Sequence, residues 1–190
     1  EFVETLLACV RLGVAAVPVN FRLVADEVDY ILRDADAAGL VVGAELAELV
    51  RAPARFRLVT GADYERAVGH ADPLPAPVDV SDEDAALVMY TSGTTGHPKG
   101  ALLSRRSLVA STLSWIHELG ATADDVWLSG QPQFHIGGIN GLLPFLFLGA
   151  TQVISPTTAF DADAAVRRLE GHDATMCIFV PTQWEEICRA

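Results

Sequence analysis

The stretch that decides the fold of this chain is an apolar run that ends abruptly in hydroxyls and glycines, Met89-Tyr90-Thr91-Ser92-Gly93-Thr94-Thr95-Gly96-His97-Pro98-Lys99-Gly100. Four of the five residues at 91–95 carry a hydroxyl, and the three glycines let the backbone turn where a side chain would clash. Successive backbone N–H groups in such a loop can form a concave nest for an anion, and hydroxyls can donate to the same oxygens. The pattern therefore predicts a loop that binds a polyphosphate.

The basic residues of the chain support this prediction. Twelve of the thirteen are arginine, so Lys99 is the single lysine, and it lies inside the predicted loop. A lysine ammonium is a compact, mobile charge, whereas arginine is a rigid fork, so the two do not replace each other. The loop is not a Walker A motif, because Pro98 stands where that motif has its second glycine and Gly100 follows the lysine. This difference counts against a P-loop ATPase or kinase.

The composition limits the class of protein further. Half of the residues are hydrophobic (51%), which is enough for an ample core, and the net charge of −12 argues against a nucleic-acid-binding surface. The three cysteines lack metal-ligand spacing and predict buried free thiols in a reducing, cytoplasmic compartment. No signal peptide is evident, and the longest apolar stretch, 142–148, is too short to cross a bilayer. Because both ends of the sequence fall within predicted helices, we expect a piece of a longer polypeptide.

Strand and helix patterns alternate along the chain, which predicts an α/β fold with a mostly parallel sheet and helices on both faces. The expected helices cover 2–12, 25–35, 44–51, 104–119, 140–148, 161–170 and a last one capped by Thr182. The expected strands cover 14–19, 40–42, 57–60, 85–90, 101–103, 126–129, 152–154 and 176–180. The segment 69–78 contains three prolines and predicts an exposed connection.

Several segments together resemble one known family. The order Y-T-S-G-T-T-G-x-P-K-G at 90–100 resembles the signature loop of the adenylate-forming (AMP-binding) superfamily, which includes acyl-CoA synthetases, luciferases and adenylation domains of peptide synthetases. Phe134-His135-Ile136-Gly137-Gly138 is similar to the aromatic-His-x-x-Gly segment that lines the acyl site of this family. The segment 13–22 resembles the acyl-CoA synthetase branch. The resemblance covers essentially the whole chain.

The resemblance implies a three-layer α/β sandwich that is part of the large N-terminal domain of adenylate-forming enzymes. Residues 1–122 would form a portion of the first subdomain, with the phosphate-binding loop at 91–100, and residues 123–190 would begin the second. The implied reaction has two halves. A carboxylate attacks the α-phosphorus of ATP to give an acyl-adenylate and pyrophosphate, and a thiol, usually coenzyme A, then attacks the activated carbonyl. The implied enzyme is an AMP-forming acyl-CoA synthetase of fatty-acid type.

The resemblance also assigns roles to particular residues. Lys99 and His135 are the candidate catalytic residues, and Thr91 is the candidate Mg²⁺ contact. Together with His135, Gly137 and Gly138 are the candidate residues that bind the carboxylic acid substrate. The residues that would hold the phosphates of ATP are Thr91, Ser92, Gly93, Thr94, Thr95, Gly96 and Lys99.

Some assignments stay open at this point. His135 lies either beside the substrate carboxylate or the thiol tunnel, or it is a structural histidine that caps a turn. His97 occupies a position where any residue before proline would serve, so the pattern gives it no role. We expect Trp115 and Trp127 to lie in the hydrophobic core. Arg105-Arg106 departs from the His-Arg or His-Asn pair expected after the loop, which leaves the anchoring of the loop open.

The resemblance leaves two other functions open. The family segments that hold adenine and ribose, the hinge and the C-terminal lysine are absent from this sequence, so we expect this chain alone to be inactive. One alternative is a ligase that loads the phosphopantetheine of a carrier protein, and another is a relative that kept the fold and lost catalysis. The implied partners are ATP, Mg²⁺, a small carboxylic acid, and coenzyme A or a carrier-protein thiol. A homodimer is compatible with the resemblance, which leaves the oligomeric state open.

Overall fold

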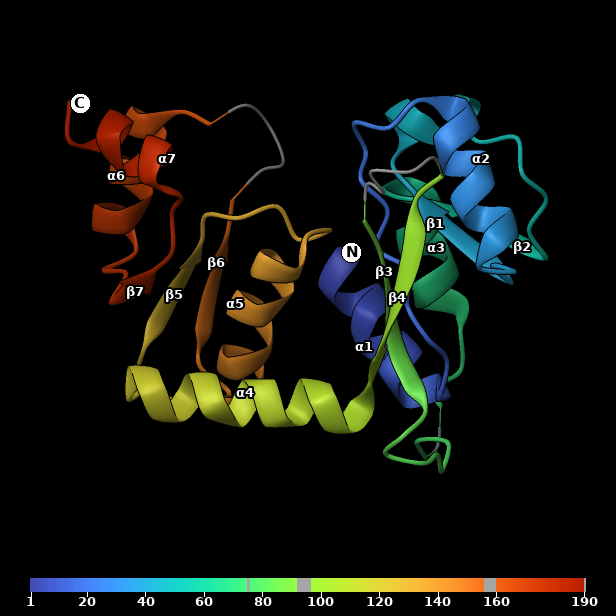
Figure 1. Cartoon of the computed structure of the whole chain (residues 1–190), viewed down its shortest axis with the longest axis horizontal. Coiled ribbons are helices and arrows are strands. Elements are labelled where there is room, and N and C mark those ends of the chain that lie inside the picture. The colour runs from blue at the N-terminus through green and yellow to red at the C-terminus, as the bar shows by residue number, and fades with distance from the viewer. Residues whose placement is uncertain (75, 92–96, 156–159, 190) are drawn as a thin grey trace. The chain divides into compact units, whose positions relative to one another are not determined.

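The computed structural model describes residues 1–74, 76–91, 97–155 and 160–189 (Figure 1). The chain divides into two compact units, Glu1–Arg106 and Ser107–Ala190. The division falls within helix α4 (Arg105–Leu119), whereas the sequence places its subdomain boundary near 122. The assignment of 1–122 and 123–190 to two subdomains therefore stays a prediction.

The first unit combines helices with two pairs of strands. Its helices are α1 (Phe2–Leu12), α2 (Ala25–Asp34), the 3₁₀ helix η1 (Ala44–Leu49) and α3 (Ala62–His70). Strand β1 (Gly39–Val42) pairs in parallel with β2 (Phe56–Val59), and β3 (Ala85–Thr91) pairs antiparallel with β4 (Lys99–Ser104). Helix α1 has the expected range, 2–12, and ends at Gly13, whose φ of 71° is left-handed, a conformation that glycine adopts readily.

The second unit is a small parallel sheet between helices. The strands lie in the order β6-β5-β7, with β5 at Val126–Ser129, β6 at Thr151–Ile154 and β7 at Met176–Cys177. Helix α5 (Ile136–Leu148) lies along one face of this sheet (Figure 1). Helices α6 (Ala162–Gly171) and α7 (Pro181–Ile187) complete the unit.

Two neighbouring residues of β5 show the three layers of this unit. Trp127 packs against Phe145 of α5, whereas Leu128 packs against Ala165 of α6. Because successive side chains of a strand point to opposite faces, helices cover both faces of the sheet. The α/β sandwich with parallel strands expected from the sequence is confirmed here. Among the described residues, however, the strands form three separate sheets in place of one.

The segment 14–19 is not the buried strand that its apolar composition predicts. Only Ala16 pairs, in a parallel bridge with Leu87, where the Ala16 N–H donates to Ala86 O and the Val88 N–H donates to Ala16 O, both at 2.9 Å. Pro18 lacks an N–H and so cannot continue a ladder. Val14 is 48% exposed, so the segment is also not buried as expected.

Other corrections concern the ends of elements. Helix α5 begins at Ile136, four residues before the expected start, and β7 has only two residues. Val180, not Thr182, is the N-cap of α7, and the Val180 N–H donates to the side chain of Gln183 at 3.0 Å. The sequence prediction omitted α3.

The cysteines differ in burial. Cys188 is exposed, so the expectation of three buried thiols is wrong for it, whereas Cys9 and Cys177 are half-buried, and all three are unbridged. In the described part of the chain, every helix is too short or too polar to cross a lipid bilayer.

Candidate functional site

The β3–β4 hairpin presents the loop that the sequence singles out. Its register pairs Tyr90 with Gly100 and Thr91 with Lys99, so Thr91 and Lys99 stand opposite each other where the loop leaves the two strands. Both side chains are exposed. An exposed hydroxyl and an exposed ammonium at one end of a hairpin can contact the same anion. The other predicted phosphate contacts lie outside the described residues: Ser92, Gly93, Thr94, Thr95 and Gly96.

Gly100 has a role in packing within the hairpin. A Cβ at Gly100 would lie 2.8 Å from Cγ1 of Val88 and 3.1 Å from Cζ of Tyr90. The absence of a side chain therefore leaves room for the Tyr90 ring to lie across the neighbouring strand. This tight fit explains a glycine immediately after Lys99.

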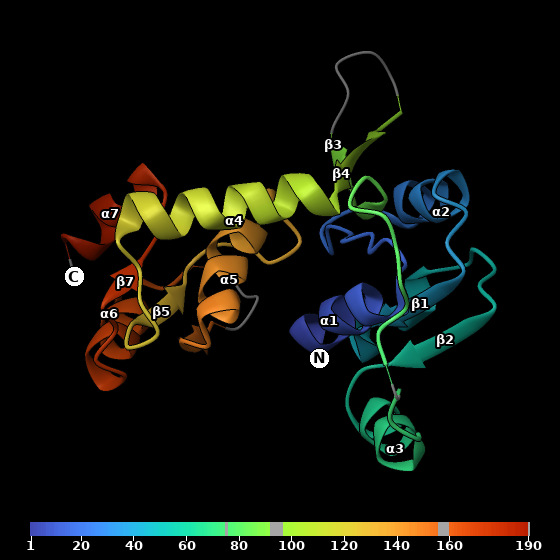
Figure 2. The ribbon, with the colours of Figure 1, turned by 90° about the horizontal axis from the view of Figure 1, so that it is seen from below.

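Helix α2 contacts the residues on both sides of the loop. Figure 1 and Figure 2 show α2 beside the paired strands. The Tyr90 hydroxyl donates to Oδ2 of Asp34 at 2.6 Å. The imidazole of His97 stacks on the ring of Tyr30, with centroids 4.6 Å apart and planes 16° apart. The sequence pattern assigns no role to His97 and does not single out Tyr30 or Asp34.

The surroundings of Tyr90 keep its phenol protonated. Burial raises the pKa of Tyr90 well above its usual value, and the hydrogen bond to Asp34 and the charge of that carboxylate raise it further. A phenol that holds its proton continues to donate to Asp34 at any physiological pH.

The two arginines after the hairpin contact neighbouring elements of the first unit. Nη1 of Arg105 donates to Val10 O at 3.4 Å, at the end of α1. Arg106 pairs with Glu83 at 2.5 Å and with Asp82 at 3.7 Å. In place of the expected His-Arg or His-Asn pair, two arginines tie the end of β4 to α1 and to the turn before β3.

In the other unit, His135 caps helix α5. Its Nδ1 accepts from the Gly137 N–H at 3.1 Å, and His135 is exposed. An accepting Nδ1 carries no hydrogen, so the proton of the neutral ring resides on Nε2. The geometry matches the structural alternative, a histidine that caps a turn, and it leaves an exposed N–H donor at the same position.

The glycines after His135 are not equivalent. A Cβ at Gly138 would lie 2.2 Å from the carbonyl oxygen of Pro132, so only glycine fits there. A Cβ at Gly137 would lie 3.4 Å from Nδ1 of His135, which is ordinary contact. Gly138 therefore fixes the approach of α5 to the preceding loop, while Gly137 supplies the capped N–H.

Trp115 and Trp127 lie in the hydrophobic core, as expected from the sequence. Trp127 is 2% exposed and stacks on Phe145, with ring centroids 4.7 Å apart, and Trp115 packs against the same cluster. Trp184 is 42% exposed, with its ring edge-on to Phe179.

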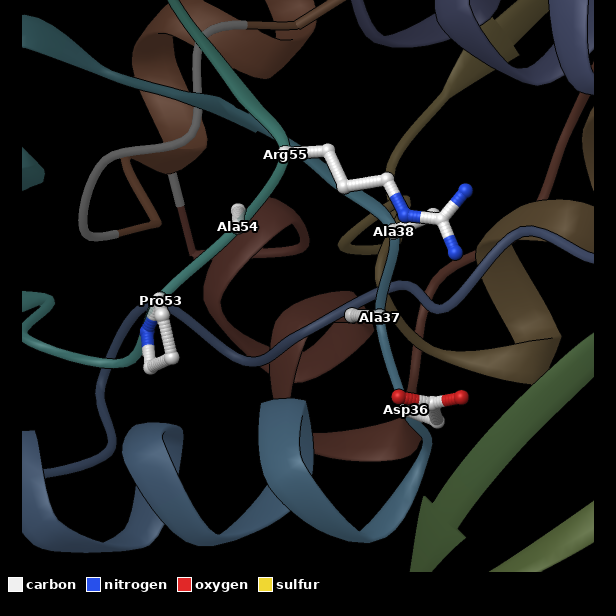
Figure 3. Close-up of a pocket in the computed structure, with 6 residues that line it drawn as sticks. All are labelled: Asp36, Ala37, Ala38, Pro53, Ala54 and Arg55. Carbon is white, nitrogen blue, oxygen red and sulfur yellow. The ribbon is translucent and has the colours of Figure 1, made fainter.

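The first unit also has a hollow of about 330 Å³ between two short segments (Figure 3). Asp36, Ala37 and Ala38 form one side, and Pro53, Ala54 and Arg55 form the other. It contains none of the candidate residues of the hairpin. Its lining offers one charge of each sign and otherwise small apolar side chains.

Comparison with known proteins places these features in a family. The family described as AMP-binding enzyme matches residues 1–190. A feruloyl-CoA synthase of Amycolatopsis sp is 36% identical over 187 residues, which covers 98% of this chain and 37% of that protein. An indoleacetate–CoA ligase of Aromatoleum aromaticum is 38% identical over 200 residues, with 97% and 38% covered.

Among solved structures, the inhibitor-bound N-terminal domain of FACL13 from Mycobacterium tuberculosis superimposes with a TM-score of 0.91. Its sequence is 26% identical, and the match covers 100% of this chain and 49% of that one. The chain spans a little over a third of the length of the two curated relatives. Because the family matches every residue and the fold agrees, the chain belongs to the AMP-binding enzyme family.

Proposed function

We propose that this chain supplies the polyphosphate-binding part of an AMP-forming acid–thiol ligase, which activates a carboxylic acid with ATP and passes the acyl group to coenzyme A. The observation that carries the proposal is the pairing of Thr91 with Lys99 at the base of the hydroxyl- and glycine-rich loop. The relatives named as a CoA synthase and a CoA ligase support the class of reaction. The activity proposed is that of the complete protein.

The first half-reaction is mostly a matter of position and charge. A carboxylate oxygen attacks the α-phosphorus of ATP, the bond to the bridging oxygen breaks, and pyrophosphate leaves with the negative charge. Donors that face this charge lower the barrier. Lys99, exposed at the base of the hairpin, would offset the charge of the departing pyrophosphate. Residues 91–96 would hold its oxygens through hydroxyls and backbone N–H groups.

The hydroxyl of Thr91 also suits Mg²⁺. This ion prefers oxygen ligands and is usually held by few protein groups together with phosphate oxygens and water. Thr91 is exposed opposite Lys99, so it offers one such oxygen at the position where phosphate would lie. When bound, the ion would neutralise phosphate charge that the single lysine cannot offset alone.

We assign the turn at 134–138 to binding of the carboxylic acid substrate. Capping by Nδ1 holds the ring of His135 in one orientation, and the Nε2–H remains as a donor suited to a carboxylate. Gly138 keeps the turn close to Pro132, and Gly137 adds a backbone N–H. In this role His135 positions the acid and takes up no proton.

The type of acid remains a prediction within this proposal. The fatty-acid type is our prediction from the sequence, whereas two relatives are named for feruloyl and indoleacetate groups. Aromatic acids are therefore the principal alternative. Coenzyme A is the proposed acceptor, and a carrier-protein thiol is the alternative.

The test is acid-dependent exchange between ATP and labelled pyrophosphate, measured on the complete protein with short aliphatic, long aliphatic and aromatic acids. We expect exchange with one class of acid. We also expect Lys99→Ala to lower kcat for exchange by about 100-fold, because it removes a charge that faces the leaving group, with little change in acid binding. Lys99→Arg should recover only part of the rate, since a guanidinium differs in shape.

The matched control is Arg66→Ala, which removes an exposed charge paired with Asp63 on α3 and should leave exchange unchanged. Equal exchange in the wild type and in Lys99→Ala would refute the role of the lysine. Absence of exchange with every acid, in a protein that still binds ATP, would favour the non-catalytic relative. Product analysis with coenzyme A or a phosphopantetheinylated carrier protein then separates the two acceptors.

A further inference from the structure

Helix α2 presents two side chains to the hairpin from one of its faces. Tyr30 and Asp34 are four residues apart, which places them one turn apart on the same side of the helix. Tyr30 stacks on His97, and Asp34 accepts from the hydroxyl of Tyr90. One helical face thus holds a residue on each side of the predicted phosphate loop.

These two contact points lie next to the residues proposed to meet phosphate. Tyr90 directly precedes Thr91, and His97 lies two residues before Lys99. Thr91 and Lys99 are also paired across the strands, so the contacts with α2 act on both arms of one hairpin. Fixing the backbone on both sides limits the directions in which the Thr91 hydroxyl and the Lys99 ammonium can project.

The helix itself is firmly placed in its unit. Ile31 is 1% exposed, and Leu32 packs in a cluster with Val42 and Val50. The buried carboxylate of Asp29 accepts from the backbone N–H groups of Arg51 and Ala52 at 2.9 and 2.8 Å. A helix tied down on its buried face can serve as a fixed reference for the loop that its exposed face contacts.

We propose that Tyr30, Asp34 and His97 are positioning residues that hold the hairpin in the geometry required for the phosphates of ATP. This inference rests on the proposed function. Its physical basis is preorganisation. Donors that are already ordered in the free protein lose little conformational entropy when the ligand binds, so binding is stronger. His97 then has a role at a position that the family pattern leaves to any residue.

The test compares truncating variants with variants that keep the contact, in the complete protein. Tyr30→Ala and His97→Ala abolish the stack, whereas Tyr30→Phe and His97→Phe keep a ring. Asp34→Ala removes the acceptor for Tyr90, whereas Asp34→Asn keeps an oxygen. We expect each alanine variant to lower kcat/KM for ATP in pyrophosphate exchange by about fivefold, which is typical for the loss of one such contact.

A role confined to positioning the loop makes three further demands. The KM for the acid should stay at the wild-type value while stability falls by no more than about 1 kcal/mol, the size of one such contact and the equivalent of a fivefold change. The conservative variants should recover most of kcat/KM. Tyr30→Ala combined with His97→Ala should lose no more than either alone, because both remove one contact. Glu65→Ala, an exposed carboxylate on α3, is the matched control and should leave kcat/KM unchanged.

Affinity for ATP, measured by calorimetry on the same variants, separates failure of this inference from failure of the proposed function. A wild type that binds ATP without acid-dependent exchange would refute the ligase. Weaker ATP binding in the alanine variants would still support the inference in that case. Alanine variants within twofold of wild type in exchange and in ATP affinity would overturn it. Parallel loss of stability and of affinity for the acid would also overturn it, since the three residues would then be structural.

Discussion

Asp29 offers the sharpest test of how α2 is held. The residue is 2% exposed, and its Oδ1 accepts from two backbone N–H groups, those of Arg51 and Ala52. Asp29→Ala leaves both N–H groups without this acceptor, and Ala52 is itself only 3% exposed. Each buried polar group that loses its partner costs roughly 1–3 kcal/mol. We therefore expect Asp29→Ala to lower the free energy of unfolding by about 3 kcal/mol.

Asp29→Asn separates the hydrogen bonds from the charge. An amide oxygen can still accept from both N–H groups, so we expect a smaller loss of about 1 kcal/mol. In the wild type, burial would raise the pKa of Asp29, but the N–H groups of Ala52 and Arg51 and the charges of Arg51 and Arg33 outweigh it and lower the pKa. The stabilisation is therefore present above the pKa of the unfolded chain and is lost as pH falls through the lower pKa of the folded state. Asp29→Asn should lack this part of the acid sensitivity.

The assay must report on the first unit. Trp115, Trp127 and Trp184 all belong to Ser107–Ala190, so tryptophan fluorescence would follow the wrong unit. Hydrogen exchange of peptides that contain Arg51 and Ala52, measured at several urea concentrations and pH values, reports on the first unit directly.

A matched control lies on the same helix and contacts the same arginine. Asp26 pairs with Arg51, but its side chain is 90% exposed, so Asp26→Ala should change stability by no more than about 0.5 kcal/mol. Equal losses for Asp26→Ala and Asp29→Ala would refute the reasoning from burial. Unchanged exchange at Ala52 in Asp29→Ala would refute the assigned hydrogen bonds.

Two further predictions concern the start of α5. His135→Ala removes the acceptor for the Gly137 N–H and should cost about 1 kcal/mol in urea unfolding. His135→Asp should restore stability, because its carboxylate also accepts from this N–H, but it offers the acid no donor, so exchange activity equal to wild type in His135→Asp would disprove the contact with the acid. Gly138→Ala would place a methyl group 2.2 Å from the Pro132 oxygen and should cost about 1–3 kcal/mol. Gly137→Ala has room for its methyl and should be close to neutral, and similar losses in both variants would contradict the packing argument.

The features that the sequence predicted well are local ones. The sequence predicts strands at 85–90 and 101–103, two short apolar runs separated by hydroxyls and glycines, and the structure has both, as the antiparallel pair β3–β4. The helices expected at 2–12 and 161–170 are present as α1, which ends at Gly13, and α6, whose N-cap Asp161 accepts from the Ala164 N–H at 2.9 Å. In each case, residues within one or two turns carry the whole physical cause.

The features that the sequence missed depend on residues far apart. Tyr90 and Asp34 are 56 positions apart, and no local periodicity pairs them. The segment 14–19 has the composition of a buried strand, but Pro18 and the lack of a continuous partner leave only a single bridge. The cap at His135 is local, and a histidine that caps a turn is one of the two alternatives left open, but the expected start of α5 is four residues too late to indicate which N–H it caps.

The charge of the chain explains why the placement of the loop matters so much. With a net charge of −12, the chain as a whole does not attract a polyphosphate. At physiological ionic strength, charges farther apart than about 8 Å are largely screened, so that repulsion acts weakly at the loop. Attraction must come from donors at contact distance, and Lys99 is the single lysine available. In the proposed site, one flexible ammonium is effective only where its backbone is held, and the pairing with Thr91 together with the contacts of α2 at Tyr90 and His97 would hold it.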